Sequence, residues 1–173
     1  MNTKNTLLAI LGGAVAYTGY TRLESNNRQN AINLVKKWLR TINLNRPSEA
    51  VELYSTDAVL VPTISSSNAI GTVEILAYME KFFTKSPFGK LVREDEFTFR
   101  PVGTGIAICE GFYDFTLQGE DVQTDESGEI TSVVPTEETV NCRFTFVFRR
   151  RLLSHVDLWE IISQQSSVVP FER

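Results

Sequence analysis

The sequence has little of the chemistry on which metal sites depend. Its 173 residues include one histidine, His155, and two cysteines, Cys109 and Cys142, which lie far apart in apolar, strand-like runs. One histidine cannot supply a three-histidine zinc site, and a mixed site would need a cysteine to converge on it. We therefore expect two buried thiols, no metal and no other cofactor. A disulfide between the cysteines stays open if the chain is exported.

The chain also lacks an excess of positive charge. It has 17 Lys and Arg against 21 Asp and Glu, a formal net charge of -4. Proteins that bind the phosphate backbone of nucleic acids normally carry a basic face, so we expect no nucleic-acid partner. The length suits a single domain with one well-filled core.

Residues 1–26 contain an apolar segment without any acidic residue. The stretch from Thr6 to Ala16 follows Lys4 and ends in the small-x-small pattern of a signal-peptide cleavage site. Extended to residues 6–23, it approaches the roughly 20 residues needed to span a bilayer. A cleaved signal and a membrane anchor both remain open, and a buried helix is less favoured because the stretch is apolar on all sides. Either leading alternative predicts a membrane-associated, exported or organellar protein.

The remainder, residues 27–173, is predicted to form one α+β domain. Apolar residues recur at intervals of three and four from Arg28 to Leu44, which predicts an amphipathic helix. A short helix is expected over Pro47–Leu53, a buried strand over Ala58–Val61, and a third helix from a cap at Thr72 as far as Phe83. Beyond Gly89 the apolar period changes to two, which predicts long antiparallel strands. Together these elements predict N-terminal helices packed on a curved, mostly antiparallel sheet that encloses a pocket.

Residues 118–138 interrupt the strand pattern with seven acidic residues and no basic one. We predict a solvated, acidic hairpin insertion, in which a loop joins two strands that pair. Calcium binding is the alternative, but the segment lacks the D-x-D-x-D-G spacing with a closing glutamate that calcium loops use.

Two clusters of polar residues directly follow predicted buried strands. Thr63 and Ser65 follow the strand that ends at Val61, and five polar residues, Ser163–Ser167, follow Trp159–Ile162. Loops at strand ends often carry binding residues. If the last strand continues, Gln164 and Ser166 face one way and Gln165 and Ser167 the other. The alternative is a solvated strand end.

Five motifs follow one another along the chain. They are Pro62–Ser65, Tyr78 with Phe82-Phe83, Gly111–Phe115, Arg143–Phe148 and Trp159 with Ser166–Pro170. In this order they resemble the iota-class carbonic anhydrases, and the resemblance extends from Ala31 to Pro170. That family shares the cone-shaped, SnoaL-like nuclear-transport-factor-type fold with the association domain of calcium/calmodulin-dependent protein kinase II. The resemblance implies a homodimer or higher homo-oligomer, and a pocket that converts carbon dioxide reversibly to bicarbonate, in some members without a metal.

The resemblance assigns roles position by position, with one departure. Gln164-Gln165 stand where the family pattern has two histidines. Glutamine can hydrogen-bond bicarbonate but cannot take a proton, and losing a general base costs about 10²–10⁴-fold in rate. We therefore predict a weakened, metal-free carbonic anhydrase. The implied catalytic residues are Thr63, Tyr78 and Ser166, and the substrate-binding candidates are Gln164, Arg143, Tyr113 and Ser167.

Two other functions remain open. The pocket could bind a small anion or apolar ligand without turnover, or the domain could be an oligomerisation module tethered at a membrane. Fold alone does not choose between these, because one fold can host enzymes and scaffolds alike.

Overall fold

A computed structural model describes residues 27–63, 65–151 and 158–170. The predicted N-terminal signal or anchor and His155 lie outside these residues. Within them, no helix is long and apolar enough to cross a membrane. The elements are, in order, a first helix of residues 27–43, α2 (Pro47–Val51), β1 (Tyr54–Val61), β2 (Ala69–Ile70), α3 (Gly71–Phe83), β3 (Phe88–Val92), the 3-10 helix η1 (Glu94–Glu96), β4 (Thr98–Val102), β5 (Ile106–Thr124), β6 (Ile130–Arg151) and β7 (Leu158–Val168).

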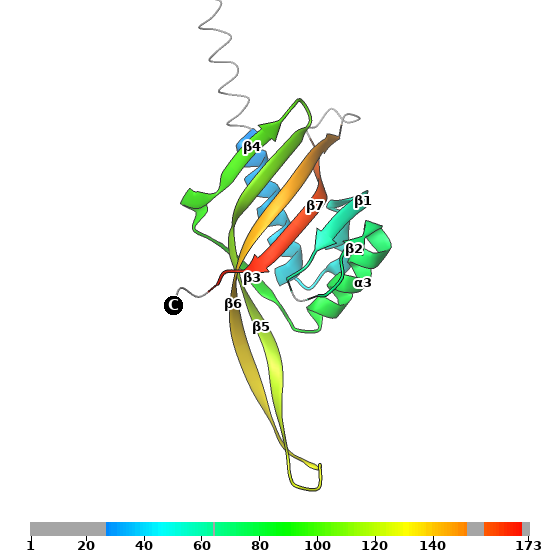
Figure 1. The fold of residues 1–173 in the computed structure, drawn as a ribbon, viewed down its shortest axis with the longest axis vertical. Coiled ribbons are helices and arrows are strands. Elements are labelled where there is room, and N and C mark those ends of the chain that lie inside the picture. Colours follow the sequence, from blue (N-terminus) through cyan, green and yellow to red (C-terminus); the bar gives the residue numbers. More distant parts are fainter. Residues whose placement is uncertain (1–26, 64, 152–157, 171–173) are drawn as a thin grey trace, which may run out of the picture.

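The strands form one seven-stranded sheet with the order β2-β1-β7-β6-β5-β3, and β4 also pairs with β5. Neighbouring strands are antiparallel except β1 and β7, which run parallel. The first helix and α3 lie against the sheet (Figure 1). This arrangement confirms the prediction of an α+β cone with helices packed on a curved, mostly antiparallel sheet.

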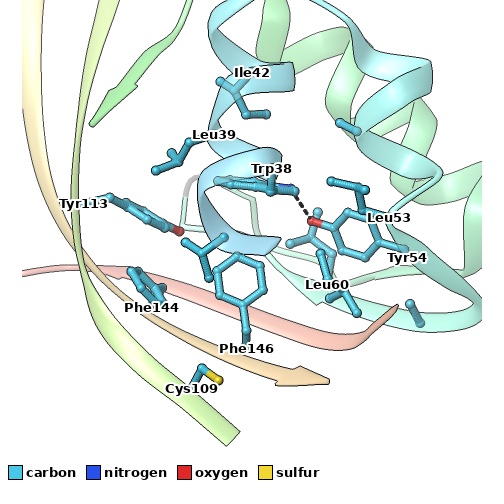
Figure 2. Packing of buried hydrophobic residues seen from close by; sticks show 14 of the residues in the cluster. Trp38, Leu39, Ile42, Leu53, Tyr54, Leu60, Cys109, Tyr113, Phe144 and Phe146 are labelled. Carbon is cyan, nitrogen blue, oxygen red and sulfur yellow. Dashed lines mark hydrogen bonds between the residues drawn. The ribbon is translucent and has the colours of Figure 1, made fainter. Parts of the chain in front are cut away.

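The first helix packs on the sheet through Trp38, which is only 3% exposed. Its ring stacks on Tyr113 at 6.0 Å between centroids and meets the edge of Phe146 at 5.6 Å (Figure 2). The apolar stripe of this helix is buried, as its periodicity predicts, because the sheet supplies an aromatic surface for it to cover.

Three element boundaries differ from the sequence prediction. The second helix ends at Val51, because the backbone already turns before β1 begins at Tyr54. Thr72 does not cap α3; the cap position is Ile70, whose side chain cannot cap, and its N–H donates to the Glu74 carboxylate at 2.8 Å. Residues Phe88–Val92, which lie where the sequence predicts the change from helix to strand, form a strand of their own, β3, in which Gly89 allows close contact with the core. A Cβ on Gly89 would lie 2.6 Å from the Phe115 ring.

Residues 118–138, predicted as an acidic hairpin insertion with a loop, are paired strands for most of their length. β5 and β6 pair with each other as far as Thr124 and Ile130, well beyond the last contacts of β5 with β3 and of β6 with β7. Figure 1 shows this segment projecting from the body as a two-stranded arm. Only its tip turns, around the Asp125 carboxylate, which accepts the Ser127 and Glu129 amides. Both faces of the arm are exposed, so no alternation of apolar residues marks its strands.

Candidate functional site

A cavity lies between the first helix, α3 and the inner face of the sheet. Its volume is about 50 Å³. The cavity therefore has room for a small ligand rather than a bulky one. Its lining residues are Trp38, Leu60, Pro62, Thr63, Tyr78, Met79, Phe82, Tyr113, Phe115, Leu117, Val140, Cys142, Gln164 and Ser166.

The walls are mostly apolar, and a pair of hydroxyl groups lies at one end. Thr63 Oγ1 donates a hydrogen bond to Ser166 Oγ at 2.6 Å. The two meet because β1 and β7 are parallel neighbours with Val61 opposite Gln165, so the residues just beyond this pair lie side by side. Parallel strand ends thus join residues that are 103 positions apart in the chain.

Gln164 lies deeper and is fixed by a hydrogen bond. Its side chain is 2% exposed, and its Oε1 accepts a hydrogen bond from the Tyr54 hydroxyl. Tyr54 Oη in turn accepts the Trp38 Nε1–H at 2.9 Å (Figure 2). A buried glutamine needs such a partner, because an unpaired amide away from water costs roughly 1–3 kcal/mol.

The titratable groups of the cavity are all neutral near pH 7. Burial raises the pKa of Tyr78 to about 12. Burial also raises the pKa of Tyr113, although Ser166 and Gln164 partly oppose this by stabilising its phenolate. The pKa of the Cys142 thiol is raised by burial as well. Among the described lining residues, therefore, none offers a base with a pKa near neutrality.

Five of the seven predicted site residues meet at this cavity. They are Thr63, Tyr78, Tyr113, Gln164 and Ser166.

Arg143 and Ser167 lie on the opposite face of the sheet. Arg143 Nε donates to Ser167 Oγ at 2.9 Å, in a groove on the outer face. The reason is the alternation of side chains along a strand: Cys142 and Phe144 are buried on the inner face, so Arg143 between them points outward. We assign these two residues no role at the cavity.

Sequence reasoning missed two residues that line the cavity, Trp38 and Cys142, and one residue behind it, Tyr54. Trp38 was read only as a core residue, and Cys142 only as a buried thiol. Tyr54 was not considered, because the predicted strand began after it. The alternation of side chains along a strand, which predicts that Gln164 faces the cavity, could also have predicted this for Cys142. Cys142 lies opposite Val168 on the adjacent strand, four residues after Gln164 and therefore on the same face.

Other polar candidates are engaged elsewhere. Glu110, a possible substitute base, pairs with Arg100 at 3.1 Å and accepts a bond from Thr98. Cys109 and Cys142 are both buried and free, so no disulfide joins them. In the part of the chain that the structure describes, no group of three or more His, Cys, Asp or Glu could hold a metal ion.

Comparisons with known proteins define the class. The structure is similar to that of a calcium/calmodulin-dependent protein kinase II association domain from Xanthomonas campestris, with 30% identity, a TM-score of 0.62, and coverage of 81% of this chain and 86% of that one. A nuclear transport factor 2-like (NTF2-like) protein from Salmonella enterica matches with 16% identity, a TM-score of 0.63, and coverage of 85% and 94%. No protein-family model and no curated protein sequence matches the chain.

A more distant similarity is to a protein described as an enzyme. A protein described as a scytalone dehydratase from Novosphingobium aromaticivorans matches with a TM-score of 0.67, coverage of 87% of this chain and 89% of that one, and 9% identity, which shows the shared fold alone. The 30% identity over most of both chains shows more. The chain belongs to the association-domain-like family of the NTF2-like cone-fold proteins. None of the three relatives described here is named as a carbonic anhydrase.

Proposed function

We propose that this protein binds carbon dioxide and bicarbonate in its cavity and interconverts them slowly, as an iota-type carbonic anhydrase-like protein without a metal. The observation that carries the proposal is the Thr63–Ser166 hydroxyl pair, 2.6 Å apart, in a small and mostly apolar cavity. Bicarbonate is a small ligand of four non-hydrogen atoms. Carbon dioxide is apolar overall and suits walls such as Leu60, Met79 and Val140.

In the proposed reaction, the hydroxyl pair orients a water molecule toward carbon dioxide. The water oxygen forms a bond to carbon, one C=O electron pair moves onto oxygen, and the water loses a proton, which gives bicarbonate. Thr63 is only half-buried, so a buffer base from solvent can take that proton. The donors around the cavity, Tyr78, Tyr113 and the Gln164 amide, stabilise the developing negative charge.

Replacing Thr63 with alanine is expected to reduce the catalysed hydration rate by about 10-fold or more, because one of the two groups that orient the water is lost. The rate of carbon dioxide hydration is measured by stopped flow with a pH indicator, on protein treated with a chelator. The matched control is Thr145→Ala, since Thr145 lies on the outer face of the sheet. Equal loss in both variants, or a wild-type rate no faster than buffer, would contradict the proposal.

Assembly with a second copy is a second candidate function, favoured by the charge distribution. The arm, residues 118–138, carries seven acidic and no basic residues, so it has a charge of -7 and the rest of the chain +3. Two arms repel each other, but an arm and the body of another copy attract. Membership of an association-domain-like family supports the same homo-oligomer.

Such an assembly is expected to dissociate as salt rises from 0.05 to about 0.5 M, because exposed charge pairs are screened. Analytical ultracentrifugation would measure the mass of the wild type beside a variant with four arm acids changed to amides: Glu120, Asp121, Glu137 and Glu138. The variant is expected to be smaller than wild type at low salt. A control with Glu52→Gln and Glu80→Gln on the body should keep the wild-type mass. An unchanged mass in the arm variant would refute this candidate.

A further inference from the structure

Three buried groups from three different elements form a hydrogen-bonded chain behind the cavity. Trp38 comes from the first helix, Tyr54 from β1 and Gln164 from β7, and each is at most 3% exposed. The Trp38 Nε1–H donates to Tyr54 Oη, and the Tyr54 hydroxyl donates to Gln164 Oε1. Figure 2 shows the Trp38–Tyr54 contact in the centre of the core.

The first hydrogen bond of this series, from Trp38 to Tyr54, has only one possible direction. An indole N–H can donate but never accept, so Tyr54 Oη must be the acceptor at this contact. The single proton of Tyr54 is then free to go to Gln164, whose side-chain oxygen is its acceptor. A carboxamide with its oxygen held in this way turns its two N–H donors to the other side.

The cavity lies on the side of Gln164 away from Tyr54. Gln164 and Tyr113 both line it, and the hydroxyls of Ser166 and Tyr78 can also donate into it. No described lining residue carries a charge that would repel an anion. A ligand there meets several donors and is best matched by oxygens that only accept hydrogen bonds.

We propose that Tyr54, backed by Trp38, is a positioning residue that holds the Gln164 amide with its N–H groups toward the cavity, and so selects a small oxyanion as the ligand. This deepens the proposed function, on which it rests for the identity of the natural anion. Tyr54 itself does not line the cavity and acts only through Gln164.

The test uses the full-length protein and nitrate, a planar oxyanion of four non-hydrogen atoms that undergoes no hydration chemistry. Nitrate binding is followed by ¹H–¹⁵N NMR of the Gln164 side-chain amide and by calorimetry at pH 7.5. Tyr54→Phe is expected to weaken nitrate binding several-fold and to remove the nitrate-induced shift of the Gln164 amide. A purely structural role for Tyr54 would not move that signal selectively.

Gln164→Glu keeps the shape and the bond from Tyr54 but replaces the N–H donors with oxygen. It is expected to weaken nitrate binding by roughly tenfold or more at pH 7.5, since a charge-assisted hydrogen bond is lost. Gln165→Glu, one residue along on the outer face, is the matched control and should bind as wild type does. This pair keeps the test valid if Tyr54→Phe fails to fold.

The possible outcomes separate the two proposals. Nitrate binding that depends on Gln164 and Tyr54 but comes without carbon dioxide hydration supports the positioning role and refutes the carbonic anhydrase proposal. No nitrate binding by wild type, or binding unchanged in both Tyr54→Phe and Gln164→Glu, overturns the positioning role whatever the hydration rate.

Discussion

Replacing Gln164 with histidine is expected to raise the carbon dioxide hydration rate by about 10²–10⁴-fold, because it supplies the general base that the cavity lacks. The cavity hydroxyls of Tyr78 and Tyr113 have raised pKa values and stay protonated near pH 7. An imidazole at position 164 would line the same cavity as the Thr63–Ser166 pair. If one ring N–H donates to Tyr54 Oη, the other ring nitrogen is free to accept a proton.

The gain should depend on pH in a defined direction. Burial disfavours the charged imidazolium, so the new histidine should have a pKa below its usual value of about 6.5. Only the neutral ring accepts a proton, so the added rate should be absent at acid pH, rise through that pKa and level off above it. The wild type should show no such inflection between about pH 6 and 8 from its cavity groups.

Gln165→His is the control for this experiment. Gln165 lies on the outer face of β7, in the groove with Arg143 and Ser167, so a histidine there cannot reach the cavity. Stopped-flow assays from pH 5.5 to 8.5 compare the carbon dioxide hydration rates of both variants with that of the wild type. An equal gain in Gln165→His, or no gain in Gln164→His despite a folded protein, would count against the cavity as the site of hydration.

The second large effect is on stability. Phe146→Ala is expected to lower the free energy of unfolding by about 3–5 kcal/mol, because it opens a void in the aromatic core. Phe146 is fully buried, and its ring lies 5.6 Å from Trp38, 5.2 Å from Phe144 and 5.6 Å from Phe148. The loss combines lost burial with lost aromatic contacts.

Phe88→Ala is the matched control, since this phenylalanine is 57% exposed in β3. Its loss should stay below about 1 kcal/mol, as for most surface substitutions. Urea unfolding followed by circular dichroism measures both variants. If Phe88→Ala lowers the free energy of unfolding as much as Phe146→Ala does, then the stability of the core does not depend on the buried phenylalanine rings of β6.

The fold could be predicted because its core elements bury one face. The stripe that includes Val35, Trp38 and Ile42 marks the first helix, and the alternation of Phe144, Phe146 and Phe148 marks β6. The length of the strands in the arm could not be predicted, since neither of its faces is buried and no alternation of apolar residues marks them. β3 was missed because Pro87 and Gly89 indicate a turn, although a glycine there serves close packing against Phe115.

The candidate site was predictable in part for the same reason. Alternation along one strand separates Gln164 and Ser166 from Gln165 and Ser167, and the cavity contains the first pair. Applied to β6, the same rule would have excluded Arg143 from the cavity. The hydrogen bond from Tyr54 to Gln164 joins residues 110 positions apart, and it follows from β1 lying beside β7, which no local pattern reveals.

The central claim is that this cavity interconverts carbon dioxide and bicarbonate without a metal. The most direct measurement is ¹³C magnetisation transfer between dissolved carbon dioxide and bicarbonate at equilibrium, with chelator-treated wild-type protein. The account predicts an exchange rate above the buffer value that rises in proportion to protein concentration and is unchanged by the chelator. Exchange at the buffer rate at every protein concentration would contradict it.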